Sequence, residues 1–246
     1  MAVRDPLVAP VHRDPLTAAA SLAGHDFVRP ALLREALTHR SAVPPRRIGH
    51  GRSAPATGAG SNERLEFIGD RVLGMLIAEW LAERFPDEQE GALGQRLAHL
   101  VSQPTIAAIA ERCGLPALLD VAAGEARAGV RKRATVLADA MEALIGALYQ
   151  DGGLAPARAF VRRAWVEAVG GMTAPPKDPK TELQEFVLAR GLPLPQYQLV
   201  NREGPPHDPV FVIAVAAGGG RGEGRAGSKR AAERLAAADL LGRLVP

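Results

Sequence analysis

Residues 62–81 read NERLEFIGDRVLGMLIAEWL, and this stretch has the clearest structural pattern in the chain. Its large apolar residues recur at helical spacing, in one series of Leu65, Ile68, Val72 and Leu76 and a second of Leu73, Ile77, Trp80 and Leu81. Such a repeat predicts an amphipathic helix with a broad apolar stripe.

Three carboxylates share one strip of this predicted helix, those of Glu63, Glu66 and Asp70. At about 100° per residue they fall within roughly 60° of one another. Like charges on one helix face cost a few tenths of a kcal/mol each, so we expect a positive partner beside them. A solvated acidic face is the alternative. Gly69 lies in the same strip and costs about 1 kcal/mol relative to Ala, which favours a second helix passing close by.

Residues 134–149, ATVLADAMEALIGALY, form a second predicted helix that is almost wholly apolar. Its only charged residues, Asp139 and Glu142, are three positions apart on one face. An isolated buried charge costs several kcal/mol, so these carboxylates need ionic partners or a metal. Small residues on the two helices would permit a close crossing: Gly69, Gly74, Ala138, Ala143 and Gly146. Two helices that each contribute acids would build an oxygen-lined site for a hard cation such as Mg²⁺.

These segments, NERLEFIGD at 62–70 and LADAMEALIGA at 137–147, resemble bacterial ribonuclease III. The resemblance implies an all-α endonuclease domain with Mg²⁺ as cofactor and Mn²⁺ as a substitute. It implies four metal ligands, namely Glu66, Asp70, Asp139 and Glu142. Asp70 and Glu142 would be the catalytic members, with Glu63 supporting the acidic strip. Arg71 stands where many members of that family have a small polar residue.

The resemblance also implies a function. We expect endonucleolytic hydrolysis of double-stranded RNA, with 5′-phosphate and 3′-hydroxyl ends and short 3′ overhangs, in the processing of rRNA precursors and of some mRNAs and tRNAs. We expect a homodimer through the endonuclease domain, in which each subunit cuts one strand. Two alternatives are a non-catalytic double-stranded-RNA-binding protein with a nuclease-like dimerisation domain, and a metal nuclease acting on DNA. The first would require the loss of one of the four carboxylates.

Further helices are predicted around this pair, at 15–22, 30–37, 91–100, 103–113 and 155–169. No strand pattern precedes residue 170, so the first domain, residues 1–172, is predicted to be all-α. Residues 1–14 are interpreted as a loose tail. Residues 43–61 are rich in Pro and Gly and predict a mobile loop, whose arginines either reach phosphates or, as we prefer, are solvated.

Two segments near the acidic helices carry positive charge. THRS at 38–41 resembles the family's entry to the active-site region, where His39 either contacts RNA or caps and packs. A basic segment precedes the second acidic helix and consists of Arg127, Arg131, Lys132 and Arg133. Such cations would hold the phosphates that flank a scissile bond, and the alternative is a solvated charge run.

Residues 173–178 are predicted to be a linker, after which the pattern changes. A helix capped by Asp178 is followed by strands at 196–202 and 210–217, a glycine-rich turn or weak third strand at 220–227, and a last helix at 228–241. This α-β-β-β-α order resembles a double-stranded-RNA-binding domain, which we place at 179–246.

The RNA contacts of that domain follow from A-form geometry, in which only the minor groove and the phosphates are accessible. Gln184 and Glu185 are expected to reach 2′-hydroxyls, and His207 a second minor groove. Lys229 and Arg230 stand at a predicted helix N-terminus, where free N–H groups and the helix dipole favour a phosphate.

The composition of the chain limits which classes of protein it can belong to. The chain has 246 residues, 47% hydrophobic and 23% charged, which is typical of one or two globular domains. Its formal net charge is only +3, so basicity must be local if it serves RNA. The single cysteine, Cys113, excludes an intrachain disulfide and fits a reducing compartment. We find no signal-peptide pattern and no run of the ~18 apolar residues that a membrane span needs, and we therefore expect a cytoplasmic protein with no membrane partner.

Overall fold

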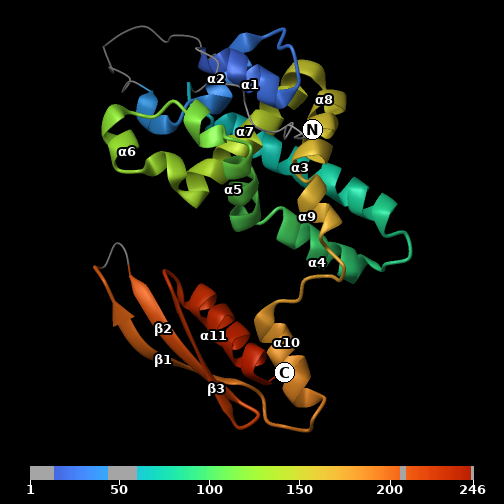
Figure 1. Cartoon of the computed structure of the whole chain (residues 1–246), viewed down its shortest axis with the longest axis vertical. Coiled ribbons are helices and arrows are strands. Elements are labelled where there is room, and N and C mark those ends of the chain that lie inside the picture. The colour runs from blue at the N-terminus through green and yellow to red at the C-terminus, as the bar shows by residue number, and fades with distance from the viewer. Residues whose placement is uncertain (1–13, 44–59, 206–208, 245–246) are drawn as a thin grey trace, which may run out of the picture. The chain divides into compact units, whose positions relative to one another are not determined.

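The computed structural model describes residues 14–43, 60–205 and 209–244. The chain divides into two compact units, 1–175 and 176–246 (Figure 1). The first unit is helical and the second is an α-β-β-β-α unit, so the predicted fold class is confirmed. The predicted tail and almost all of the predicted 43–61 loop lie outside the described residues. Within the described ranges, no helix is long and apolar enough to cross a membrane.

The helices of the first unit are α1 (Pro15–Ala23), α2 (Pro30–Leu37), α3 (Glu63–Arg84), α4 (Glu90–Leu100), α5 (Gln103–Arg112), α6 (Ala123–Arg127), α7 (Ala134–Gly152), α8 (Leu154–Ala164) and α9 (Val166–Gly170). Short 3-10 turns add η1 (Arg40–Ala42), η2 (Leu115–Leu118) and η3 (Val130–Lys132). In the described part of this unit, β-type pairing is limited to one bridge between Thr38 and Asp120.

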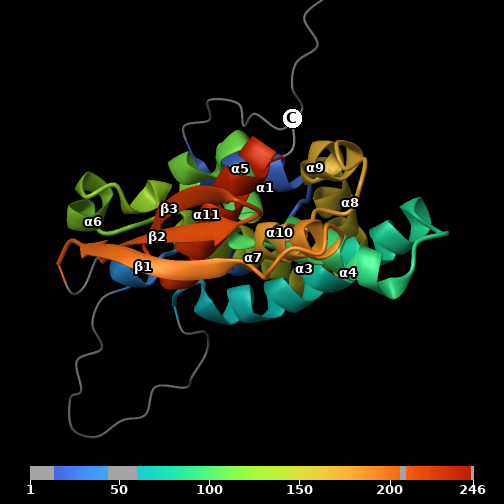
Figure 2. The same cartoon turned by 90° about the horizontal axis from the view of Figure 1, so that it is seen from below.

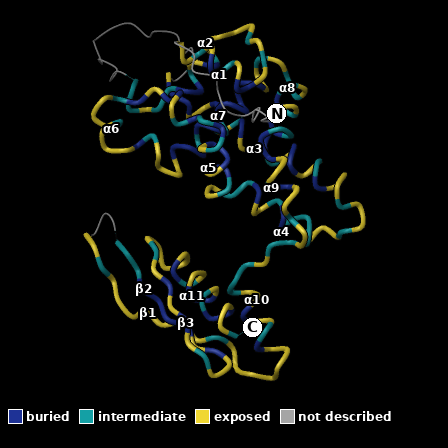
Figure 3. Tube along the Cα trace, in the orientation of Figure 1, coloured by how far each residue is buried: buried dark blue, intermediate teal, exposed yellow. Residues whose placement is uncertain are grey.

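Helix α7 is the centre of the first unit, with α2, α3, α5 and α8 packed around it (Figure 1). Its trace is mostly buried, as Figure 3 shows. A helix that is apolar nearly all round has to be covered on every side, which explains this central position.

The crossing of α3 and α7 depends on two glycines. A Cβ added at Gly69 would lie 1.7 Å from the carbonyl oxygen of Glu142, and one at Gly146 would lie 2.2 Å from that of Leu65. The two backbones are therefore in direct contact, as the small residues predicted. Gly74 was predicted to take part and does not, because a Cβ there would meet nothing within 4 Å.

The prediction of one continuous helix over 155–169 is wrong, since α8 ends at Ala164 and α9 begins at Val166. Trp165 lies between them with φ −95° and ψ 1°. Its indole is fully buried, and its Nε1 donates a hydrogen bond of 3.0 Å to the carbonyl oxygen of Leu100. The break in the helix thus coincides with a side chain anchored in the core.

The second unit consists of α10 (Pro179–Leu188), β1 (Gln196–Glu203), β2 (Val210–Ala217), β3 (Gly220–Ala226) and α11 (Lys229–Leu244). The strands form one antiparallel sheet in the order β1-β2-β3, visible in Figures 1 and 2. Leu183 and Val187 of α10 share a buried cluster with Val215 of β2 and with Ala236 and Leu240 of α11. Asp178 caps α10 as predicted, its carboxylate accepting a 2.9 Å bond from the backbone N–H of Lys180.

The glycine-rich stretch that predicted a turn or weak strand is a full strand, β3. A Cβ at Gly222 would lie 2.4 Å from the carbonyl oxygen of Ala236, and one at Gly224 would lie 2.2 Å from that of Ala232. Helix α11 therefore lies directly against the β3 backbone. The alternating glycines leave room for that helix, which is why they do not act as breakers here.

Candidate functional site

An acidic cluster forms where α3 crosses α7. It consists of Glu66, Asp139 and Glu142, each of which offers a carboxylate oxygen within 4.8 Å of those offered by the other two. All three residues are half-buried. Because Gly69 and Gly146 let the backbones touch, acids from both helices converge at this crossing.

Burial is the largest cause of a raised pKa at each carboxyl group of this cluster. It raises the pKa of Glu142 to about 8, with additional repulsion from Asp70, Glu66 and Asp139. The pKa values of Glu66 and Asp139 are also raised, in both cases mainly by burial. A divalent cation between the oxygens would favour the ionised carboxylates again. This all-oxygen donor set fits a hard cation such as Mg²⁺.

The other two acids predicted for this site lie at its edge. The Glu63 carboxylate accepts a 3.0 Å hydrogen bond from the Ser61 hydroxyl and raises the pKa of Glu66. Asp70 is not part of the three-residue cluster. Its carboxylate instead accepts a 2.7 Å hydrogen bond from the guanidinium of Arg71. Asp70 remains close enough to raise the pKa of Glu142, and its role as a ligand stays a prediction.

A cleft of about 720 Å³ opens beside the cluster. Its lining includes the acids Glu63, Glu66 and Asp139 and the basic residues His39, Arg40 and Arg133. His39 and Arg40 offset part of the effect of burial, which on balance still raises the pKa of Asp139. The cleft thus combines the acids that would hold a cation with the bases that would hold a phosphate.

Backbone hydrogen bonds place the segment 38–41 beside this cleft. The Asn62 N–H donates to the Thr38 carbonyl at 3.0 Å, and the His39 N–H donates to the Asp120 carbonyl at 2.9 Å. The His39 ring caps η1, with its Nδ1 accepting a 3.2 Å bond from the N–H of Ser41. The capping interpretation of His39 is therefore confirmed, and an RNA contact stays a prediction.

The residues of the predicted basic segment do not all lie at the cleft. Arg133 lines the cleft, whereas Arg131 lines a different hollow together with Asp120. Arg127 bonds to the carbonyl of Ala123 in its own helix. Arg40 lines the cleft and was not singled out from the sequence, although its place beside His39 in the THRS motif was a usable signal.

In the second unit, Gln184 of α10 and Arg230 of α11 line one hollow of about 520 Å³. Lys229 and Arg230 are exposed at the start of α11, as predicted. Glu185 is exposed and pairs with Lys177 at 2.6 Å. His207 lies outside the described residues.

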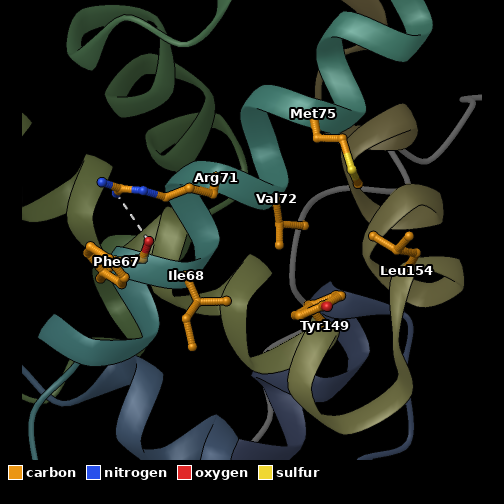
Figure 4. Close-up of a pocket in the computed structure, with 7 residues that line it drawn as sticks. All are labelled: Phe67, Ile68, Arg71, Val72, Met75, Tyr149 and Leu154. Atoms are coloured by element: carbon orange, nitrogen blue, oxygen red, sulfur yellow. Dashed lines mark hydrogen bonds between the residues drawn. The ribbon is translucent and has the colours of Figure 1, made fainter.

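An apolar hollow of about 370 Å³ lies on α3, α7 and α8 of the first unit, and Figure 4 shows the side chains around it. It is lined by Phe67, Ile68, Arg71, Val72, Met75, Tyr149 and Leu154. Phe67 is 63% exposed and Met75 is 47% exposed, so two large apolar side chains of this hollow face solvent. The helical stripe read from the sequence did not include Phe67, so this surface was not located in advance.

The comparisons with known proteins agree with both units. Residues 29–169 match the family model "Ribonuclease-III-like", and residues 179–244 match "Double-stranded RNA binding motif". The chain is 46% identical to the Ribonuclease 3 of Rhodopseudomonas palustris over 221 residues, which are 89% of this chain and 78% of that protein. It is also 46% identical to the Ribonuclease 3 of Phenylobacterium zucineum over 222 residues, 89% of this chain and 88% of that one.

A solved nuclease domain of ribonuclease III from Campylobacter jejuni is similar with a TM-score of 0.53 and 29% identity, covering 63% of this chain and 97% of that one. Sequence, fold and the acidic crossing of α3 and α7 lead to one conclusion. The chain belongs to the ribonuclease III family, as a ribonuclease III-like domain followed by a double-stranded RNA binding motif.

Proposed function

We propose that this protein is a divalent-cation-dependent endoribonuclease that cuts double-stranded RNA and leaves 5′-phosphate and 3′-hydroxyl ends with short 3′ overhangs. The observation that carries this proposal is the convergence of Glu66, Asp139 and Glu142 beside a cleft that also contains Arg40 and Arg133. An isolated group of half-buried carboxylates would be unfavourable for folding, so its presence indicates a use.

In this proposal Glu66, Asp70, Asp139 and Glu142 hold Mg²⁺, for which Mn²⁺ substitutes. The bound cation would lower the pKa of a water molecule and stabilise charge on the scissile phosphate. Glu66, Asp139 and Glu142 act by being fixed in advance on two helices whose backbones touch, so these three carboxylates need little reorganisation. Arg40 and Arg133 hold the phosphates that flank the cut bond.

The second unit would supply duplex affinity. Gln184 and Glu185 are exposed on α10 and would reach 2′-hydroxyls, and Lys229 and Arg230, exposed at the N-terminus of α11, would bind a phosphate. His207 keeps its predicted role in a second minor groove. The RNA substrates that we propose are precursors of rRNA and some mRNAs and tRNAs, and the cytoplasm is the proposed location.

We further propose a homodimer through the first unit. A two-fold contact brings the same patch of both subunits together. The exposed Phe67 of each subunit would then pack against the apolar hollow of the other, which would remove both from water. The solved Campylobacter jejuni nuclease domain has a region involved in dimer formation, which supports a dimer through the corresponding unit of this chain.

Replacing Phe67 by Ser is expected to weaken dimerisation at least about a hundredfold, because a buried aromatic anchor is worth about 2 kcal/mol or more and a two-fold contact contains it twice. Sedimentation equilibrium of the full chain would measure this. Val28, which is 84% exposed and does not line the hollow, is the matched control as Val28→Ser. A Phe67→Ser protein that dimerises as tightly as the unchanged chain would exclude this surface.

The activity is tested by incubating the protein with a long RNA duplex and with a DNA duplex of the same sequence. We expect cleavage of RNA alone, and only with Mg²⁺ or Mn²⁺. With Ca²⁺ we expect binding without cleavage, since Ca²⁺ accepts the same oxygens but is larger and has looser coordination geometry. Binding without cleavage in every cation would favour the non-catalytic alternative, and cleavage of DNA would favour the DNA nuclease.

A further inference from the structure

Arg71 lines the apolar hollow, and three contacts hold its side chain. Its Nη1 donates a 2.7 Å hydrogen bond to the Oδ2 of Asp70 and a 3.2 Å hydrogen bond to the carbonyl oxygen of Phe67. Its Cζ lies 4.2 Å from the centre of the Phe67 ring. Figure 4 shows the guanidinium beside this ring, with the bond to the carbonyl dashed. The side chain is therefore anchored to one turn of α3.

The guanidinium of Arg71 is paired with Asp70. Of the four proposed metal ligands, Asp70 is the one that does not belong to the acidic cluster. Glu66, Asp139 and Glu142 meet within 4.8 Å, and Asp70 does not join them. Asp70 and Arg71 are nonetheless near the cluster, because the charge of Asp70 raises and that of Arg71 lowers the pKa of Glu142. An alternative position of Asp70 at the cluster would have to break or loosen its pair with Arg71.

We propose that Arg71 is a positioning residue that holds Asp70 out of the carboxylate cluster in the cation-free protein and so opposes divalent-cation binding. This inference rests on the proposed metal site. A guanidinium and a cation compete for the same carboxylate. Cation binding therefore has to overcome the free energy of the Asp70–Arg71 pair and is weaker by that amount. An exposed ion pair is worth up to about 1 kcal/mol, and 1.4 kcal/mol corresponds to a factor of ten.

The test measures Mn²⁺ binding to the full-length protein without RNA, by electron paramagnetic resonance of free Mn²⁺ at fixed ionic strength. We expect Arg71→Ser to tighten Mn²⁺ binding about threefold. Arg64→Ser is the matched control, because Arg64 is an exposed arginine of the same helix that does not line the cleft. It removes the same charge, and we expect a change of less than about 1.5-fold.

A double-mutant cycle separates pairing from simple charge. In an Asp70→Asn background, Arg71→Ser should tighten Mn²⁺ binding clearly less than threefold, because the carboxylate that Arg71 restrains is absent and only the direct effect of its charge on Glu142 remains. A threefold gain that persists in this background would overturn the proposal, as would equal effects of Arg71→Ser and Arg64→Ser in the otherwise unchanged chain.

The same measurement separates this proposal from the metal site on which it rests. If Mn²⁺ does not bind to the unchanged protein, or binds equally well after Glu142→Gln, the metal site is wrong and this inference falls with it. If Mn²⁺ binding depends on Glu142 but not on Arg71, the metal site stands and only the role of Arg71 is overturned.

Discussion

Replacing Glu142 by Ala is expected to slow cleavage of duplex RNA at least about a thousandfold and to leave duplex affinity nearly unchanged. The side chain is half-buried in the acidic cluster and makes no hydrogen bond that the fold would miss among the described contacts. Ala is also a good helix former, so α7 should persist. What is lost is a charge placed to hold a cation, and a thousandfold in rate corresponds to about 4 kcal/mol.

Single-turnover cleavage and a gel-shift titration on the same duplex would read the rate and the affinity separately. Arg64→Ser, on α3, is a suitable control for handling and folding. A Glu142→Ala protein that cuts within tenfold of the unchanged rate would remove Glu142 from the site.

The isosteric change Glu142→Gln tests the charge state without the cation. The pKa of Glu142 is raised to about 8 in the fold from its ordinary value of 4.5, so the folded state binds more protons between these two values. The stability contributed by the protonated form is fully present below pH ~4.5 and is lost as the pH rises through ~8. Glu142→Gln should therefore stabilise the cation-free protein more at pH ~9 than at pH ~5. Urea unfolding in EDTA would show this, and equal midpoint shifts at both pH values would contradict it.

Replacing Gly69 by Ala is expected to destabilise the first unit by at least about 3 kcal/mol, although Ala is the better helix former. The new Cβ would lie 1.7 Å from the carbonyl oxygen of Glu142, an atom of the α7 backbone that cannot rotate away. The two helices must separate, which opens voids between their buried faces. Overpacking of a core commonly costs about 1–3 kcal/mol, and a backbone clash lies at or beyond the upper end of that range.

Gly74→Ala is the matched control for this change. It is the same substitution five residues along the same helix, at a position where a Cβ would meet nothing within 4 Å. It should stabilise the protein by about 0.5–1 kcal/mol, because Gly in a helix interior is unfavourable. Urea unfolding at one protein concentration would compare the two. Similar effects of both changes would show that α3 and α7 do not touch as described.

Local pattern was sufficient to predict much of this protein. The 3.6-residue repeats of 62–81 and 134–149 predicted α3 and α7, and the acids at three-residue spacing predicted that Asp139 and Glu142 share a face. The change of pattern after residue 178 predicted the α-β-β-β-α unit. These features depend on spacing within one segment, which the sequence states directly.

Tertiary structure decided which neighbour each of these faces meets. Gly69 contacts α7 and Gly74 does not, although both are glycines of one helix. Asp70 carries the same charge as Glu66 but lies toward Arg71, outside the cluster. The glycines of β3 are typical of a turn in the sequence, and only the contact with α11 shows why a strand needs them. Helical and strand periods define the direction in which a side chain leaves its own element, but the atoms it meets belong to segments far away along the chain. Only the packed structure brings those segments together.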